Sequence, residues 1–73
     1  MEFTKDIEKG NGAIIRISLQ KYKGHEFIDV RQYYLDESAG EYKPTKKGIT
    51  IHPESLNEVI TILKELNKSL EEI

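Results

Sequence analysis

Apolar and polar residues alternate along the first half of the chain in a pattern typical of β-strands. In residues 13–20, aliphatic side chains alternate with Arg16 and Ser18, which predicts a half-buried strand. A second strand is predicted over residues 27–35, which are rich in aromatic and β-branched side chains. Alternation divides its side chains between two faces, with Phe27, Asp29, Arg31 and Tyr33 on one and Ile28, Val30, Gln32 and Tyr34 on the other.

Two shorter strands and a helix are predicted in the second half. Residues 41–47 resemble a strand, but Pro44 cannot donate to a ladder and belongs at an edge or a break. A fourth strand covers residues 49–52, and Pro53 is suited to the first turn of a helix. The predicted fold is therefore α+β: a four-stranded antiparallel sheet (about 13–52) and one C-terminal helix (about 53–72), forming a single domain over residues 13–73. Residues 1–12 are polar and are expected to be a flexible segment, with a turn or hinge at Gly10-Asn11-Gly12.

The predicted helix carries more apolar surface than one small sheet needs. From Leu56 onward, apolar residues recur at alternating spacings of three and four, a heptad pattern that favours packing against another helix. The seam positions are Leu56, Val59, Leu63, Leu66 and Leu70. A chain of 73 residues without cysteine has a small core and no disulfide to reinforce it. We therefore expect a homodimer with this seam in its interface; a helix that packs only on its own sheet is the alternative.

The net charge of −2 hides an uneven distribution of charged residues. Residues 13–47 carry seven cationic and five acidic side chains, whereas the last 21 residues carry five acidic and two basic ones. A basic sheet and an acidic helix would let the protein bind a polyanion by one face only. An ordinary solvated surface is the alternative explanation of the same charges.

No constellation of catalytic or metal-binding residues is evident. His25 and His52 lie in unrelated contexts, and with no cysteine they are too few ligands for a structural zinc site. The serines lack the context of an activated nucleophile. We expect no enzyme activity, metal or cofactor. No apolar run approaches the roughly 20 residues of a membrane span, and no charged-then-apolar leader follows Met1, so we expect an intracellular, cytoplasmic protein that makes no membrane contact.

Residues 22–51 interleave aromatic and cationic side chains, which suits the binding of a single nucleic-acid strand. Unpaired bases can stack on tyrosine rings while lysine and arginine contact phosphates, and neither contact needs a particular base.

The motifs in this segment resemble those of the positive cofactor four family of transcriptional coactivators. They are Tyr22-Lys23-Gly24, Ile28-Asp29-Val30-Arg31, Tyr33-Tyr34, Lys43-Pro44 and Lys46-Lys47-Gly48-Ile49. The resemblance implies a homodimer of four-stranded sheets with the helices in the interface, and grooves that bind single-stranded DNA or melted duplex. It implies that Tyr22 and Tyr34 stack on bases. The implied DNA-binding residues are Tyr22, Lys23, Arg31, Tyr34, Lys43, Lys46 and Lys47, with Arg16 and Lys21 as secondary candidates.

The sequence thus favours a non-catalytic, largely sequence-independent single-stranded DNA-binding protein. Such a protein would regulate transcription by holding melted DNA, in company with the transcription machinery and, in a prokaryote, with the nucleoid. Two alternatives stay open. The chain could be a protein-interaction module of the transcription machinery whose acidic helix recruits a partner, or its ligand could be single-stranded RNA, because stacking and phosphate contacts do not require deoxyribose.

Overall fold

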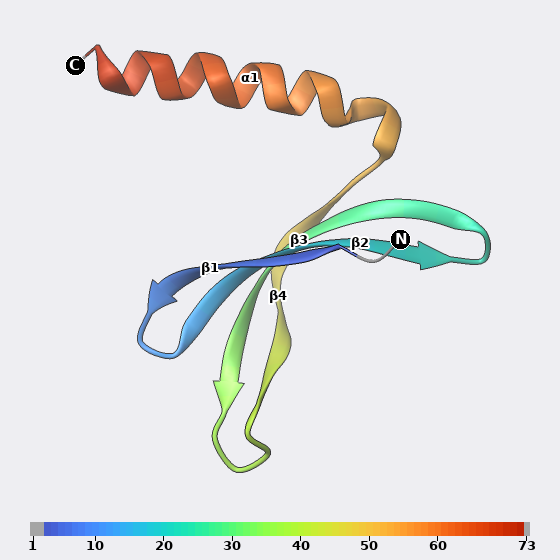
Figure 1. Ribbon diagram of the computed structural model, residues 1–73, viewed down its shortest axis with the longest axis vertical. Coiled ribbons are helices and arrows are strands. Elements are labelled where there is room, and N and C mark those ends of the chain that lie inside the picture. Colours follow the sequence, from blue (N-terminus) through green and yellow to red (C-terminus); the bar gives the residue numbers. More distant parts are fainter. Residues whose placement is uncertain (1–2, 73) are drawn as a thin grey trace.

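The computed structural model describes residues 3–72 as one antiparallel sheet followed by one helix (Figure 1). The elements are β1 (Thr4–Gly10), β2 (Ala13–Tyr22), β3 (His25–Asp36), β4 (Glu41–Ile51) and α1 (Pro53–Glu71). The strands lie in the order β1-β2-β3-β4, and each is antiparallel to its neighbours. The predicted α+β fold class, with four antiparallel strands and one C-terminal helix, is confirmed.

The expectation that residues 1–12 are flexible was wrong for the part that the structure describes. Residues 4–10 form β1, an edge strand paired with β2 from Thr4 to Gly10, while residues 1 and 2 lie outside the described residues. The segment has one aliphatic side chain, Ile7, so its pattern alone did not indicate a strand. It is held instead by the ladder to β2 and by contacts such as Ile7 opposite Ile15. Gly10-Asn11-Gly12 is the hairpin turn, and all three residues have positive φ.

The prediction of separate strands at 41–47 and 49–52 was also wrong, because both belong to β4. Between the pairs Tyr33–Pro44 and Arg31–Gly48, β4 has two more residues than β3, so a bulge lies opposite Gln32. The Thr45 hydroxyl donates to the Gln32 carbonyl oxygen (2.7 Å) and accepts from the Lys47 N–H (3.1 Å), which replaces ladder bonds lost in the bulge. Pro44 lies on an edge strand, as its missing donor requires.

Cross-strand register arranges the side chains of the sheet in rows on two different faces. One row is Asp6, Arg16, Arg31 and Gly48; we call its side of the sheet the arginine face. The other side, which we call the aliphatic face, is defined by Ile15, Ile17, Val30 and Ile49. Arg31 and Tyr34 therefore lie on opposite faces of β3, as strand alternation predicted.

Helix α1 covers only one end of the aliphatic face. Leu56 lines an apolar hollow with Phe3, Leu19 and Ile28, and Leu56 and Val59 are half-buried. Beyond these first turns the helix runs clear of the sheet (Figure 1). Among the described residues, no helix is both long enough and apolar enough to cross a membrane.

Little of the chain is buried by this arrangement. Ile14, with 3% of its surface exposed, is the one fully buried hydrophobic residue that the described part of the chain contains. Ser18 and Asp29 are the buried polar residues there. The core of a single chain is therefore small, as expected from its length.

Gly48 is required for the close approach of Arg31 to β4. A Cβ at position 48 would lie 2.8 Å from the Val30 carbonyl oxygen and 2.9 Å from Arg31 Cβ. We expect Gly48→Ala to lower the free energy of unfolding by about 1–3 kcal/mol, the usual range for overpacking, measured by urea unfolding at fixed protein concentration. Lys46→Ala, an exposed change in the same bulge, is the control and should stay within about 0.5 kcal/mol of the parent. Equal stability of Gly48→Ala and the parent would contradict the close approach.

Candidate nucleic-acid interface

The hairpin between β2 and β3 presents Tyr22 to solvent. The chain reverses through Lys23 and Gly24, which both have positive φ, and this geometry matches the twist of the flanking strands. Tyr22 is 65% exposed, and the Lys23 ammonium lies 5.4 Å from the centre of its ring. An open aromatic face with a cation beside it is what stacking on a base next to a phosphate requires. Lys21 is exposed on the same hairpin, opposite Glu26.

Tyr34 lies near the other end of β3. It is 46% exposed and faces Ala13 on β2 and Lys43 on β4. Lys43 is not a free cation, because its ammonium contacts an Asp36 carboxylate oxygen at 3.0 Å. Tyr34 therefore has a lysine beside it whose charge is already shared with a carboxylate.

Asp36 organises the turn between β3 and β4. Its carboxylate accepts hydrogen bonds from the Ser38 hydroxyl (2.7 Å) and the Ala39 N–H (3.3 Å), and its backbone carbonyl accepts from the Gly40 N–H (2.8 Å). These contacts favour the charged carboxylate. The hydrogen bond from Ser38, followed by that from Lys43, lowers the Asp36 pKa below its usual value.

The two arginines at the centre of the arginine face are both paired with aspartates. Arg16 donates to both Asp6 carboxylate oxygens, at 2.8 and 3.1 Å, and its guanidinium lies over the Tyr33 ring, 4.6 Å from the centroid. These hydrogen bonds lower the Asp6 pKa and raise that of Arg16. Arg31, which lies opposite Arg16 on β3, contacts at 3.2 Å the carboxylate of Asp29, two residues before it on the same strand.

The Arg31 guanidinium is held by a backbone hydrogen bond in addition to its ion pair with Asp29. Its Nη1 donates to the carbonyl oxygen of Thr45 at 2.8 Å, so the guanidinium crosses Gly48 to reach the bulge. Asp29 is buried. The centre of the arginine face is therefore a row of matched charges rather than a patch of free cations.

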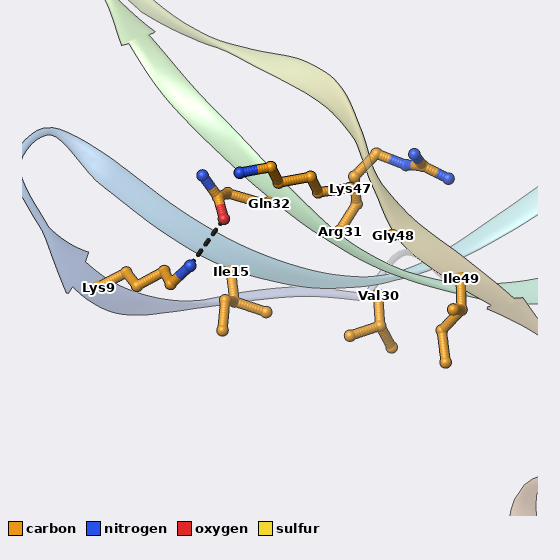
Figure 2. A pocket seen from close by; sticks show the side chains of 8 residues that line it. All are labelled: Lys9, Ile15, Val30, Arg31, Gln32, Lys47, Gly48 and Ile49. Atoms are coloured by element: carbon orange, nitrogen blue, oxygen red, sulfur yellow. Dashed lines mark hydrogen bonds between the residues drawn. The ribbon is translucent and has the colours of Figure 1, made fainter.

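The bulge in β4 places Lys46 and Lys47 at the sheet surface. Both are exposed, and no ion pair involves either of them within residues 3–72. Lys47 borders an open hollow of about 320 Å³ (Figure 2). In Figure 2, Ile15, Val30 and Ile49 project in one direction, while the Arg31 side chain extends away from them. Lys9 lines another side of this hollow, and its ammonium donates a hydrogen bond to the side-chain carbonyl of Gln32 at 2.8 Å.

The structure brings the predicted binding residues to the surface but does not gather them at one point. His25, which faces Tyr22, and Tyr34 are nine residues apart on β3, which corresponds to roughly 30 Å. By register, Tyr22 lies on the arginine side and Tyr34 on the aliphatic side. The roles of these residues in binding stay a prediction, because no nucleic acid is present.

Four residues at this surface were missed by the sequence interpretation. Asp6 and Lys9 lie in the segment that was expected to be flexible, so neither was considered. Tyr33 was read only as part of an aromatic pair, and Gln32 only as a residue of alternating polarity. Strand register alone pairs Asp6 with Arg16, so placing β1 against β2 would have found that contact. Within the part of the chain that the structure describes, no cluster of His, Cys, Asp or Glu is arranged to hold a metal.

The helical seam is largely uncovered. Leu63, Leu66 and Leu70 are 57%, 54% and 61% exposed. Ile7 and Ile49 on the sheet are also more than half exposed. Of the five seam residues, Leu56 and Val59 are half-buried, and Leu56 lines the apolar hollow on the chain's own sheet.

Comparison with known proteins identifies relatives over most of the chain. The family model described as Transcriptional Coactivator p15 (PC4) matches residues 9–62. The RNA polymerase II transcriptional coactivator SUB1 of Saccharomyces cerevisiae is 34% identical over 55 residues, which are 75% of this chain and 19% of the yeast protein. A putative RNA polymerase II transcriptional coactivator of Caenorhabditis elegans is 28% identical over 78% of this chain and 46% of the relative. The chain thus spans less than half the length of these curated relatives.

Solved structures show the same fold. A PC4 homologue from Burkholderia pseudomallei is 38% identical and superposes with a TM-score of 0.79, covering 86% of this chain and 84% of the homologue. A bacteriophage T5 homologue of the eukaryotic coactivator PC4, implicated in recombination-dependent DNA replication, has a TM-score of 0.81. It covers 96% of this chain and 81% of the phage chain at 18% identity, a likeness that shows the fold alone.

The contacts of Asp36 predict a pH-dependent contribution to stability. Because its pKa is lower in the folded chain than in the unfolded one, the contribution is present above about pH 4 and is lost as the pH falls through the folded pKa. We expect Ser38→Ala and Lys43→Met each to raise the Asp36 pKa, with the larger change from Ser38→Ala, as followed by NMR titration of the carboxyl carbon. Lys46→Met is the control; a rise as large in that variant would mean that general charge, not these contacts, sets the pKa.

Proposed function

This chain belongs to the Transcriptional Coactivator p15 (PC4) family, and we propose that it is a non-catalytic single-stranded DNA-binding protein that acts in transcription. The observation that carries the proposal is the placing of two exposed tyrosines beside lysines, Tyr22 with Lys23 and Tyr34 with Lys43. The first pair combines a stacking surface for an unpaired base with a cation for the adjoining phosphate, and the second adds a stacking surface beside a lysine that is paired with Asp36. Neither pair offers the donor and acceptor pattern that would select a base, so binding is largely independent of sequence.

The names of two curated relatives support the proposed role in transcription. Two of them are named as coactivators of RNA polymerase II, one of these putatively. Because this chain spans less than half of either relative's length, the role that we propose for it is limited to the binding domain: it holds melted DNA while the transcription machinery acts.

The spacing of the two tyrosines suits one extended strand. The two tyrosines lie roughly 30 Å apart along β3 and on opposite sides of the sheet, so a strand that contacts both has to follow the twist of the sheet. Single-strand binding domains occupy about 4–16 nucleotides. The strand would pass from the β2–β3 hairpin to Tyr34, where Lys46 and Lys47 in the bulge supply further phosphate contacts.

We also propose that the functional unit is a homodimer. Exposed leucines along α1 and exposed isoleucines on the aliphatic face leave more apolar surface open than a soluble single chain ordinarily shows. A second copy offers both kinds of surface at once, and the chain's small core makes such burial necessary for stability.

Two other functions fit particular observations. Base stacking and phosphate contacts do not involve the sugar, so the same exposed residues would bind single-stranded RNA as well as DNA. The uncovered seam on an acidic helix would also suit a protein partner in the transcription machinery. In that case, charge reversal at Lys46 and Lys47 would leave partner capture intact, whereas it should abolish DNA binding under our proposal.

Binding is tested by fluorescence anisotropy with a labelled oligodeoxythymidine of about 20 nucleotides, a matching RNA strand and a duplex, each at two salt concentrations. We expect preference for the single DNA strand over the duplex, with a salt slope of about −0.7 per phosphate contacted. Tyr34→Ala and Tyr22→Ala should each weaken binding roughly five- to 150-fold, equivalent to the loss of about 1–3 kcal/mol of stacking.

The matched controls are Tyr34→Phe and Tyr22→Phe, which keep the ring and should retain most of the affinity. Full binding by both alanine variants would exclude stacking on these tyrosines. No binding by a folded parent protein would reject the DNA-binding proposal and leave partner capture as the leading function. Tighter binding of the RNA strand than of the DNA strand would favour single-stranded RNA as the ligand.

The dimer is tested by a charge placed in the seam. Leu66→Lys puts an ammonium where a partner would exclude water, so we expect this variant to have the mass of a single chain by sedimentation or light scattering. Thr61→Lys introduces the same charge on the opposite side of α1, at an exposed position, and should keep the mass of the parent. A dimeric Leu66→Lys protein, or a parent that is itself a monomer, would refute the proposed interface.

A further inference from the structure

Arg16 has the geometry of an anion-binding residue whose site is filled by the protein's own carboxylate. Its Nε and Nη2 donate to the two oxygens of Asp6 at 2.8 and 3.1 Å, the paired arrangement that a phosphate oxygen pair would also accept. Its guanidinium lies against the Tyr33 ring. Arg31 is directly opposite on β3, so a second cation lies beside the first.

The two arginine–aspartate pairs on this face differ in how easily they can be opened. Asp29 is buried, and Arg31 is also held by the Thr45 carbonyl. Asp6, by contrast, belongs to the edge strand β1, every residue of which is exposed, and its side chain is 38% exposed against 25% for Arg16. Exposed pairs of this kind contribute little net stability, so an incoming anion can exchange with the carboxylate at small cost.

We propose that a backbone phosphate of the bound single strand replaces Asp6 on Arg16, so that Asp6 is a built-in competitor that lowers the affinity of the arginine face for the strand. This inference rests on the proposed function. Tyr33 keeps the guanidinium in place when Asp6 leaves, so the site is preformed for the phosphate. Arg31 remains bound to Asp29 and supplies a nearby positive field without changing partner.

Because Asp6 competes with the phosphate for Arg16, removing the Asp6 charge should change the affinity for the strand more than removing another negative charge nearby. The charged groups on this part of the face are Asp6, Glu8, Arg16, Asp29 and Arg31. Glu8 is two residues from Asp6 on the same strand, faces Ile14 and makes no ion pair within the described residues. Its carboxylate therefore carries the same charge in almost the same place without occupying Arg16.

The test compares Asp6→Asn with Glu8→Gln in the binding of a labelled oligodeoxythymidine of about 20 nucleotides at low salt. Both variants remove one negative charge, so long-range repulsion falls by a similar amount in each. We expect Asp6→Asn to tighten binding about two- to five-fold, the range set by a surface pair, and Glu8→Gln to tighten it clearly less. In Asp6→Asn/Arg16→Met, the gain should disappear, because no guanidinium is left to receive the phosphate.

Thermal unfolding of each variant shows whether the fold is kept. Tighter binding by an Asp6→Asn protein that is no more stable than the parent supports exchange at Arg16. Equal effects of Asp6→Asn and Glu8→Gln, weaker binding by Asp6→Asn, or a gain that persists without Arg16 would each overturn the inference while the proposed function stands. If the parent and all variants fold but none binds the strand, the proposed function and the inference both fail.

Discussion

The structure depends on one constraint: its single helix is too small to bury the apolar side of the four-stranded sheet. Four strands present two faces, and a single helix of 19 residues covers only the end of one of them. Burial of apolar surface is the main source of stability in small domains, yet Ile14 is the one fully buried hydrophobic residue in the part of the chain that is described. The chain leaves its remaining aliphatic surface on one side of the sheet and along one side of the helix, where a second copy can cover both together.

This arrangement frees the opposite side of the sheet for polar chemistry. Arg16 and Arg31 lie opposite each other there, and each is paired with an aspartate, Arg16 with Asp6 and Arg31 with Asp29. Close contact between β3 and β4 is possible because Gly48 has no side chain, and the Thr45 hydroxyl satisfies backbone groups that the bulge would otherwise leave unpaired. Aromatic rings remain exposed near the two ends of the sheet, where no such packing constrains them.

Much of the fold could be predicted because β2, β3 and α1 carry strong periodic patterns. β1 could not, because Ile7 is its one aliphatic side chain and its pairing depends on contacts across the hairpin, such as those with Ile15 and Arg16. The two strands predicted over residues 41–47 and 49–52 end on either side of Gly48, whereas in the structure Gly48 lies within β4 and allows a close approach to Arg31. Tyr22 and Tyr34 were found at exposed positions, whereas Arg31 is half-buried. The aspartate partners of Arg16 and Lys43 follow from register and turn geometry, which the sequence pattern did not show.

The two edges of the sheet also determine how the chain avoids misassembly. An unpaired edge strand can recruit another strand and begin aggregation, unless charges, proline or a bulge interrupt it. Both edges here have such protection: β1 reads Thr-Lys-Asp-Ile-Glu-Lys-Gly, and β4 carries Pro44 and a bulge. A newly made chain is thereby discouraged from extending its sheet. In the homodimer that we propose, copies would meet through their aliphatic surfaces instead, and such an association ends with a closed pair rather than a fibre.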